Sequence, residues 1–210
     1  MGAPINELYG QNECNLVVSS SAGLGVLKAG TMGQAVPGHD VAILAADGTP
    51  LPAGETGEIA VRRPDPVMFL GYWNAPEKTR EKFVGDWLRT GDLGTVDAEG
   101  FFTYVSRDDD IITSAGYRIG PTEIENCLAG DPDVVMAAAV GRPDPERTEI
   151  VVAHVVLREE AVRDGLEERL MQRVRDRVSP HVAPREIIVA ESLPMTATGK
   201  IMRRALRDSG

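Results

Sequence analysis

The 210-residue chain has an ordinary globular composition, with 42% hydrophobic and 26% charged residues, and its formal net charge is −10. Because acidic side chains outnumber basic ones in both halves, the sequence lacks the basic excess that draws a nucleic-acid backbone, and we expect no nucleic-acid partner. The length allows one large or two small domains with buried cores.

The sequence shows no clear signal peptide, membrane-spanning segment or disulfide framework. Cys14 and Cys127 are far apart, which indicates neither a disulfide framework nor a zinc site and suits a reducing compartment. The longest apolar runs, residues 134–140 and 150–157, are strand-sized and too short to span a bilayer. The first ten residues lack the basic and apolar regions of a signal peptide. We therefore expect a soluble cytoplasmic protein with no membrane partner.

Short strands separated by turn residues characterise the first half of the chain. Val41–Leu44 and Glu58–Val61 are strand-like and flank Asp47-Gly48, a strong turn signal. The stretch DLGTVDAEGFFTYVS repeats this plan, with DAEG as its turn. The pattern predicts a β-rich, barrel-like architecture over residues 1–106.

Helical periodicity begins after residue 106. The stretch GPTEIENCLAG predicts a helix that opens at Pro121 and stops at Gly130. A second helix, about residues 159–178, is predicted by apolar residues four apart, Val162, Leu166, Leu170 and Val174. Strands at 134–140, 150–157 and 186–190 alternate with the helices. The fold class is therefore α/β in the sense of mixed α+β, with a small α+β domain over residues 107–210.

Three loops are candidates for chemistry on their residue types alone. SSSAGLG, residues 19–25, lacks the Lys-Ser/Thr of a phosphate-binding loop, so a flexible surface loop is the better interpretation. Asp92 in RTGDLG stands at the head of a predicted tight turn, where an Asx turn would explain it. The three carboxylates of Asp108–Asp110 repel one another and belong in solvent or beside a cation, as in an inter-domain linker.

Four motifs together carry a resemblance to a known family. They are YGQNE (9–13), WLRTGDLG (87–94), SRDDDIITSAGYRIGPTEIE (106–125) and LPMTATGKIMRR (193–204). In this order they resemble the later motifs of the adenylate-forming superfamily. SAGYRIGPTEIE looks most like the short- and medium-chain acyl-CoA synthetases. The resemblance implies an AMP-forming acid–thiol ligase that uses a small carboxylic acid, ATP and coenzyme A.

The resemblance implies a nucleotide-binding set. Asp92 would accept hydrogen bonds from the ribose hydroxyls, and Arg107 would contact the same ribose. Tyr9 and Gly10 belong to the same set. Asn12 stands where the family usually has a threonine that touches the α-phosphate, and its amide would donate in place of that hydroxyl.

The resemblance also implies a metal ligand and a catalytic lysine. Glu13 would bind the Mg²⁺ that neutralises the phosphates. Lys200, the only lysine after residue 106, would reach both the substrate carboxylate and the α-phosphate. A compact ammonium on a long stem suits this bridging role better than a planar guanidinium. Thr196, Thr198 and Gly199 would give its loop the freedom to insert and withdraw.

A hinge and a coenzyme A passage complete the implied site. The motif places the hinge at Asp109, with Asp110 beside it, so that the small domain rotates between the two half-reactions. Gly116 and Tyr117 would line the pantetheine passage, where a Cβ at position 116 would crowd the thiol arm. Arg118 is assigned to the coenzyme A site with them.

Two interpretations of the whole chain remain open. The family's phosphate loop and most of its acyl-pocket walls lie upstream of YGQNE, so the chain resembles the last part of such an enzyme, inactive without a missing N-terminal half. Alternatively, it is a non-catalytic module that binds a nucleotide or a partner. Acetate-restricted relatives have a tryptophan where this chain has Gly10, which predicts an acid longer than acetate.

Overall fold

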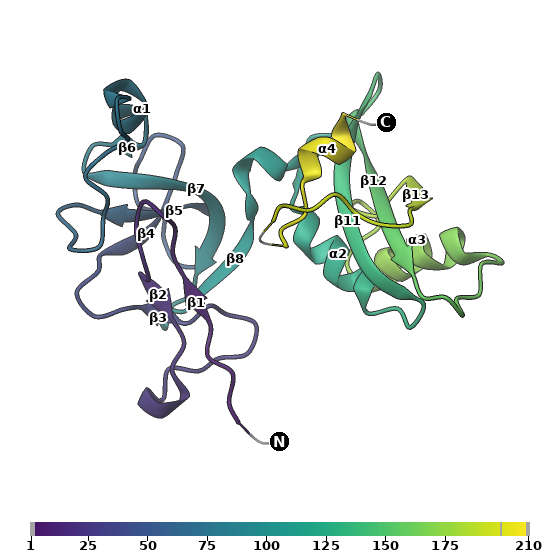
Figure 1. The fold of residues 1–210 in the computed structure, drawn as a ribbon, viewed down its shortest axis with the longest axis horizontal. Coiled ribbons are helices and arrows are strands. Elements are labelled where there is room, and N and C mark those ends of the chain that lie inside the picture. Colours follow the sequence, from purple (N-terminus) through teal and green to yellow (C-terminus); the bar gives the residue numbers. More distant parts are fainter. Residues whose placement is uncertain (1–2, 198, 209–210) are drawn as a thin grey trace. The chain divides into compact units, whose positions relative to one another are not determined.

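A computed structural model describes residues 3–197 and 199–208 of the chain (Figure 1). The backbone forms two compact units, residues 1–108 and 109–210, and each has its own hydrophobic core. The first unit is rich in strands, and the second packs helices against a sheet. The predicted mixed α+β fold class is confirmed.

Two antiparallel sheets build the first unit. The smaller has the order β1-β2-β3, with bounds Leu8–Tyr9, Val18–Ser19 and Gln34–Ala35. The larger has the order β4-β5-β7-β6, and β8 pairs with the second half of β7. Its bounds are Val41–Leu44 for β4, Gly57–Arg62 for β5, Phe83–Val84 for β6, Trp87–Val96 for β7 and Phe102–Arg107 for β8. The barrel-like expectation is wrong, because no strand in the described ranges joins β4 at one edge of this sheet to β6 or β8 at the other.

The β4–β5 hairpin follows the pattern predicted from its turn residues. The two strands pair antiparallel with Val41 opposite Val61. Gly48 has a φ of +87°, which glycine adopts without steric cost, and its N–H donates to the carbonyl of Ala45 at 3.0 Å. Alternate residues of these strands, including Ile43 and Ile59, enter the core of the unit. Two short helices, η1 (Ala22–Leu24) and α1 (Pro76–Glu81), were not predicted.

The second unit has one sheet with the order β10-β9-β12-β11, and β13 runs parallel to β12. The long antiparallel pair of β11 and β12 forms its centre. The strands are β9 Ile112–Ser114, β10 Tyr117–Ile119, β11 Val134–Asp144, β12 Thr148–Leu157 and β13 Glu186–Val189.

Helices cover both faces of this sheet, which explains the continuous apolar runs of its central strands. Ala137 and Ala139 of β11 share a buried cluster with α2 (Pro121–Ala129) and α3 (Leu166–Arg177). The alternate residues Ala138 and Val140 belong to a second cluster with α4 (Arg203–Arg207). No helix in the part of the chain that the structure describes has the length and apolar character needed to cross a membrane.

The predicted start of α3 is wrong by seven residues. The helix begins at Leu166 and not near residue 159, because Gly165 before it has a φ of +64° and cannot belong to a right-handed helix. Val162, predicted to lie on the apolar face, is 59% exposed. Leu166, Leu170 and Val174 are buried as predicted. The helix α2 has the predicted start at Pro121 and ends before Gly130.

Burial of His154 predicts an acid sensitivity of the second unit. Burial lowers the pKa of this imidazole below its usual 6.5, against the opposing effect of Glu186. The unfolded chain therefore binds a proton before the folded one does, and stability is lost as the pH falls from about 6.5 through the folded-state pKa. Amide exchange of β12, corrected for its intrinsic rate, should accelerate across this range. The variant His154→Leu should lose that dependence and His181→Gln should keep it; equal pH profiles for parent and His154→Leu would contradict the assignment.

Candidate active site

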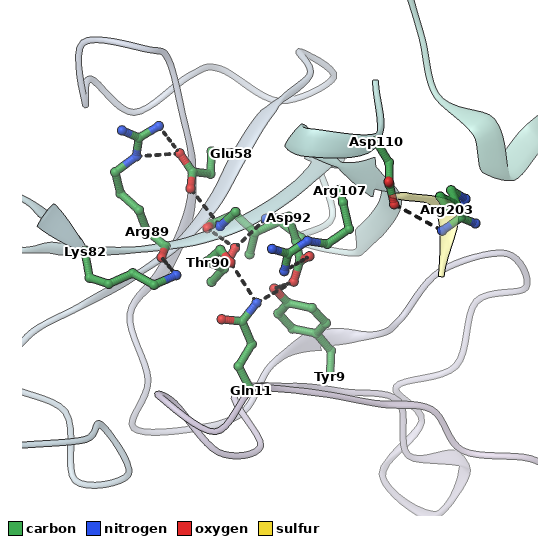
Figure 2. A network of polar contacts seen from close by, with 12 residues as sticks. Tyr9, Gln11, Glu58, Lys82, Arg89, Thr90, Asp92, Arg107, Asp110 and Arg203 are labelled. Carbon is green, nitrogen blue, oxygen red and sulfur yellow. Dashed lines mark hydrogen bonds and ion pairs between the residues drawn. The ribbon is translucent and has the colours of Figure 1, made fainter. Parts of the chain in front are cut away.

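In the first unit, the carboxylate of Asp92 accepts hydrogen bonds from three side chains (Figure 2). Tyr9 Oη donates to Oδ2 at 2.8 Å, and Gln11 Nε2 donates to the same oxygen at 2.7 Å. Arg107 Nη1 donates to Oδ1 at 3.1 Å. Burying a carboxylate is unfavourable unless donors and an opposite charge replace water, and this cluster supplies both. Burial and the charge of Asp92 raise the pKa of the Tyr9 phenol far above its usual value, so it remains a donor at neutral pH.

A bulge in β7 presents Asp92 to these donors. The register of β5 against β7 shifts opposite Ile59, where Thr90, Gly91 and Asp92 leave the regular pairing. Gly91 has a φ of +77°, in the left-handed region. The buried Thr90 hydroxyl donates to the Ile59 carbonyl at 2.6 Å and accepts from the Asp92 N–H at 3.1 Å. Asp92 thus lies within a bulged strand, and the tight turn expected there from the sequence is wrong.

Glu58 holds the bulge in place and was missed by the sequence analysis. Its Oε1 accepts from the Gly91 N–H at 2.8 Å, and its Oε2 accepts from Arg89 Nε at 2.6 Å (Figure 2). Only 9% of Glu58 is exposed. The available signal was a single charged residue in the otherwise apolar stretch GEIAV, residues 57–61 of β5.

Glu13 has one carboxylate oxygen bonded to Tyr72. The Tyr72 hydroxyl donates to Glu13 Oε1 at 2.5 Å, and this bond is the largest cause of a lowered Glu13 pKa. Burial, together with Glu13, raises the pKa of Tyr72 to about 12. The Glu13 carbonyl accepts from the Phe69 N–H at 2.8 Å, which ties the loop after β1 to the segment before α1. Glu13 is half-buried, and Asn12 beside it is exposed.

The main chain approaches Gly10 closely. A Cβ added there would lie 2.6 Å from the Asn15 carbonyl oxygen and 2.9 Å from the Leu16 nitrogen. Both are backbone atoms, so any side chain at position 10 requires the main chain to shift. Local packing therefore favours glycine at position 10. This reason is independent of the predicted size of the acyl pocket.

Replacing Tyr72 by phenylalanine should destabilise the first unit at neutral pH by about 0.5–1.5 kcal/mol, because one hydrogen bond between two partly exposed side chains is lost. Because the pKa of Glu13 is lower in the folded protein than its unfolded value of 4.5, the pairing stabilises the fold above pH 4.5. This stabilisation is lost as the pH falls through the folded-state pKa. The difference between parent and Tyr72→Phe should therefore narrow in acid. Denaturant unfolding followed by fluorescence of Trp73 and Trp87 measures it, with Tyr117→Phe in the other unit as control. A pH-independent difference would contradict the pairing.

In the second unit, Lys200 follows a tight turn. The Thr196 N–H donates to the Lys200 carbonyl at 2.8 Å, and the Gly199 N–H donates to the Thr196 carbonyl at 2.9 Å. The Lys200 N–H donates to Thr196 Oγ1 at 3.0 Å, and Gly199 has a φ of +79°. These bonds leave the Lys200 side chain exposed at the end of the turn. Thr198, expected to contribute to this loop, lies outside the described residues.

The other predicted residues of the second unit lie near its first strands. The Asp109 carbonyl accepts from Arg207 Nη1 at 2.9 Å. Gly116, in the turn between β9 and β10, has a φ of +83° and open space where a Cβ would lie, so its conformation and not its packing favours glycine. Tyr117 is half exposed and stacks on His181 with ring centroids 4.8 Å apart. Arg118 lies next to it in β10 with its side chain exposed.

The structure gathers the candidate residues into two sets. In the first unit, Tyr9, Arg107 and Gln11 each donate a hydrogen bond to Asp92. Glu13 lies in the same loop as Gln11 but bonds to a different partner. Lys200 and Asp109 belong to the second unit. Within the described ranges, no group of three or more His, Cys, Asp or Glu side chains is arranged to hold a metal ion.

Comparisons with known proteins match both units. The family described as AMP-binding enzyme matches residues 1–73, and the AMP-binding enzyme C-terminal domain matches residues 123–200. The anthranilate CoA ligase AuaEII, solved with anthranoyl-AMP, superposes with a TM-score of 0.89 at 32% identity over 99% of this chain and 40% of that one. A benzoate CoA ligase from Burkholderia xenovorans gives 0.86 at 36% identity over 98% of this chain and 41% of that one. The chain belongs to the adenylate-forming, AMP-binding enzyme family.

Within that family the similarity is to acyl-CoA synthetases. The human mitochondrial acyl-coenzyme A synthetase ACSM1 is 41% identical over 212 residues, covering 98% of this chain and 37% of ACSM1. The acyl--CoA ligase YtcI of Bacillus subtilis is 42% identical, covering 98% of this chain and 39% of YtcI. The chain thus spans less than two-fifths of the length of these relatives. The predicted resemblance is confirmed.

Proposed function

We propose that this chain forms the adenylate-handling part of an AMP-forming acyl-CoA synthetase. In the first step, a carboxylate oxygen attacks the α-phosphorus of ATP, which yields an acyl-adenylate and releases pyrophosphate. In the second step, the coenzyme A thiol attacks the acyl carbon, the C–O bond breaks, and AMP leaves. The observation that carries the proposal is the buried Asp92 carboxylate and its donors, in a chain similar to acyl-CoA synthetases along nearly its whole length.

The Asp92 cluster suits recognition of a ribose. A diol donates two hydrogen bonds, and a fixed carboxylate is the acceptor that pairs with both. Arg107 holds one oxygen of that carboxylate and, with a partly exposed guanidinium, is able to donate to the same sugar. Tyr9 and Gln11 fix the other oxygen, so that Asp92 does not have to reorganise on binding. Gly10, between them in sequence, allows the tight path of this loop.

Glu13 fits a role as a magnesium ligand. Mg²⁺ in nucleotide sites takes one or two protein carboxylates and fills its remaining positions with phosphate oxygens and water. The lowered pKa of Glu13 keeps this carboxylate ionised at neutral pH. The bound ion would neutralise charge on the phosphates. The exposed Asn12 amide beside Glu13 would donate to the α-phosphate.

Lys200 is proposed as the catalytic residue of the first step. Its ammonium stabilises negative charge on both the attacking carboxylate and the α-phosphate as the adenylate forms. The turn formed by Thr196 and Gly199 holds the backbone on its N-terminal side, while the side chain is exposed and able to enter a site. The long, flexible lysine stem supplies the reach.

The second unit, residues 109–210, is proposed to act as the mobile domain that the sequence predicts over residues 107–210, with its hinge at Asp109. Rotation there would exchange the face that presents Lys200 for the face that carries Gly116, Tyr117 and Arg118. That second face would line the coenzyme A passage. The positive φ at Gly116 and the exposure of Tyr117 keep this edge of the unit open.

The acid is proposed to be larger than acetate, either medium-chain or a small aromatic acid. Two similar solved enzymes act, by their names, on benzoate and anthranilate. Gly10 places no side chain in the region that a tryptophan fills in acetate-restricted relatives. The cytoplasmic location expected from the sequence stays a prediction, because the relatives include mitochondrial and bacterial proteins.

Catalysis is proposed to require the N-terminal portion that the relatives have and this chain does not. The chain can be fused behind the N-terminal portion of the Burkholderia xenovorans benzoate CoA ligase, which supplies a known acid as probe. This fused enzyme should form benzoyl-CoA from benzoate, ATP and coenzyme A. The 210-residue chain and the N-terminal portion should each be inactive alone. A folded fusion that forms no benzoyl-CoA would contradict the proposed function.

A further inference from the structure

The short helix that follows Lys200 is anchored to the turn at Asp109. The helix α4 begins at Arg203, three residues after Lys200, and its Leu206 is buried against the sheet. The Met202 N–H donates to the Pro194 carbonyl at 2.8 Å, which closes the base of the Lys200 loop. The Lys200 loop and the start of α4 therefore form one hydrogen-bonded segment.

Arg203 links three elements of the second unit. Its Nη1 donates to Asp110 Oδ2 at 3.1 Å (Figure 2). Its Nε and Nη2 form a two-point contact with the Glu125 carboxylate of α2, at 3.0 and 2.7 Å. Glu125 Oε1 also accepts from the Ala139 N–H of β11 at 2.9 Å. One guanidinium thus ties the turn at Asp110 to a helix and, through that helix, to the central sheet.

Arg207, one helical turn later, holds the same turn from a second point. Its Nη1 donates to the main-chain carbonyl of Asp109 at 2.9 Å, and its Nη2 lies 3.3 Å from Asp110 Oδ1. The two arginines therefore occupy both oxygens of Asp110 and the backbone of Asp109. We name Arg203, Arg207, Asp110 and Glu125 the arginine latch.

The latch is more enclosed than an ordinary surface ion pair. The side chains of Asp110 and Glu125 are each 12% exposed, and those of Arg203 and Arg207 are 20% and 29% exposed. Two guanidiniums face two carboxylates, so the charges balance, and the two-point Arg203–Glu125 contact fixes direction as well as distance. Arg204, between them on the same helix, has a side chain that is 91% exposed and lies 3.9 Å from Asp208. The arginines of this segment therefore differ in role, although they are identical in type.

We propose that Arg203 and Arg207 are positioning residues that couple the turn at Asp109 to the Lys200 loop. This inference rests on the proposed function, in which Asp109 is the hinge and Lys200 the catalytic residue. With the latch closed, α4, the Lys200 loop and the residue beside the hinge move as one body. Rotation at Asp109 then carries Lys200 into or out of the site without loss of its orientation. Without the latch, rotation at Asp109 no longer places the Lys200 loop in one fixed orientation.

The first test uses the full 210-residue chain and needs no activity. An endoproteinase that cleaves before aspartate reports how firmly the turn at Asp108–Asp110 is held. Removing the latch in Arg203→Ala/Arg207→Ala should raise the cleavage rate there at least about tenfold, since cleavage follows the open population. The control Arg204→Ala should leave the rate unchanged. Amide exchange of β12 shows whether the second unit remains folded. If the double variant does not fold, the single variant Arg207→Ala replaces it in the cleavage assay. Equal cleavage of parent and latch variants, with β12 protected, would overturn the latch.

The second test separates positioning from general destabilisation. In the fused enzyme, Arg207→Ala should lower the rate constant of adenylation about tenfold and leave the KM for ATP unchanged, because Arg207 positions Lys200 and touches no substrate. The variant Arg207→Lys should recover part of the rate, and Arg204→Ala should match the parent. An unchanged rate constant in Arg207→Ala would overturn the coupling. Lys200→Gln leaves the arginine latch intact and should resist cleavage as the parent does. If Lys200→Gln were fully active, the proposed function would be rejected. The cleavage test of the latch would still stand, because it does not depend on activity.

Discussion

Replacing Lys200 by glutamine should lower the rate of adenylation by the fused enzyme at least about 100-fold, the usual effect of losing one preorganised electrostatic contact in a transition state. Glutamine is shorter than lysine but keeps a polar end, and it removes the positive charge that stabilises the attacking carboxylate and the α-phosphate in the transition state. Affinity for AMP should change less than the rate, because the preorganised ammonium stabilises the transition state more than the ground state. Single-turnover formation of benzoyl-adenylate, followed by quenching and chromatography, measures the effect directly.

The matched control for this substitution is Lys78→Gln, which removes the charge of an exposed lysine in α1. It should leave adenylation unaltered. Lys200→Arg should also lose most activity, because a planar guanidinium does not replace a compact ammonium between two acceptors. Adenylation at the parental rate in Lys200→Gln would reject the assignment of the catalytic residue, whatever the behaviour of the control.

Replacing Asp92 by asparagine should damage both the first unit and its nucleotide site. In the parent, the Asp92 carboxylate accepts hydrogen bonds from Tyr9, Gln11 and Arg107. Asparagine replaces one of the two acceptor oxygens by an NH2 group, which is itself a donor and cannot accept from these side chains. We expect a loss of about 2–3 kcal/mol in the free energy of unfolding, because buried donors are left without acceptors. Affinity of the fused enzyme for AMP should fall at least about tenfold, since one charged acceptor for the ribose is lost.

Two measurements check the Asp92 prediction. Denaturant unfolding followed by the fluorescence of Trp87, which lies in the same strand, gives the stability change. Calorimetric titration with AMP gives the affinity, measured at a denaturant-free condition where the variant is folded. Asp86→Asn is the control, because Asp86 is 60% exposed and pairs only at the surface with Arg63. Equal stability and equal AMP affinity in Asp92→Asn and parent would contradict the site as described.

Elements with local signals were predicted from the sequence, and elements set by tertiary contacts were not. The β4–β5 hairpin and α2 carry their own turn, start and stop residues in Gly48, Pro121 and Gly130, and the structure has them where expected. The start of α3 was wrong because a four-residue stripe does not mark where a helix begins, whereas Gly165 does. The open sheet of the first unit was mistaken for a barrel, because strand patterns alone do not reveal which edges pair.

In the candidate site, too, residues within local motifs were predicted, and contacts made by the tertiary fold were not. The motifs identified Tyr9, Asp92 and Arg107, and the structure brings these three together across more than 80 residues of sequence separation. Glu58 and Tyr72 were missed because their roles arise from a bulge and from a loop contact that no local pattern encodes. Gln11 stands inside a recognised motif, yet its bond to Asp92 becomes visible only when β7 lies beside that loop. The link from Arg207 to Asp109, 98 residues apart, is of the same kind.

Benzoate-dependent exchange of pyrophosphate into ATP by the fused enzyme tests directly whether this chain supplies the adenylating residues. We expect exchange that requires benzoate, disappears in Lys200→Gln, and is absent from the 210-residue chain and from the N-terminal portion assayed separately. A folded fusion without exchange, or equal exchange by the N-terminal portion alone, would contradict the claim that this chain supplies the adenylating residues.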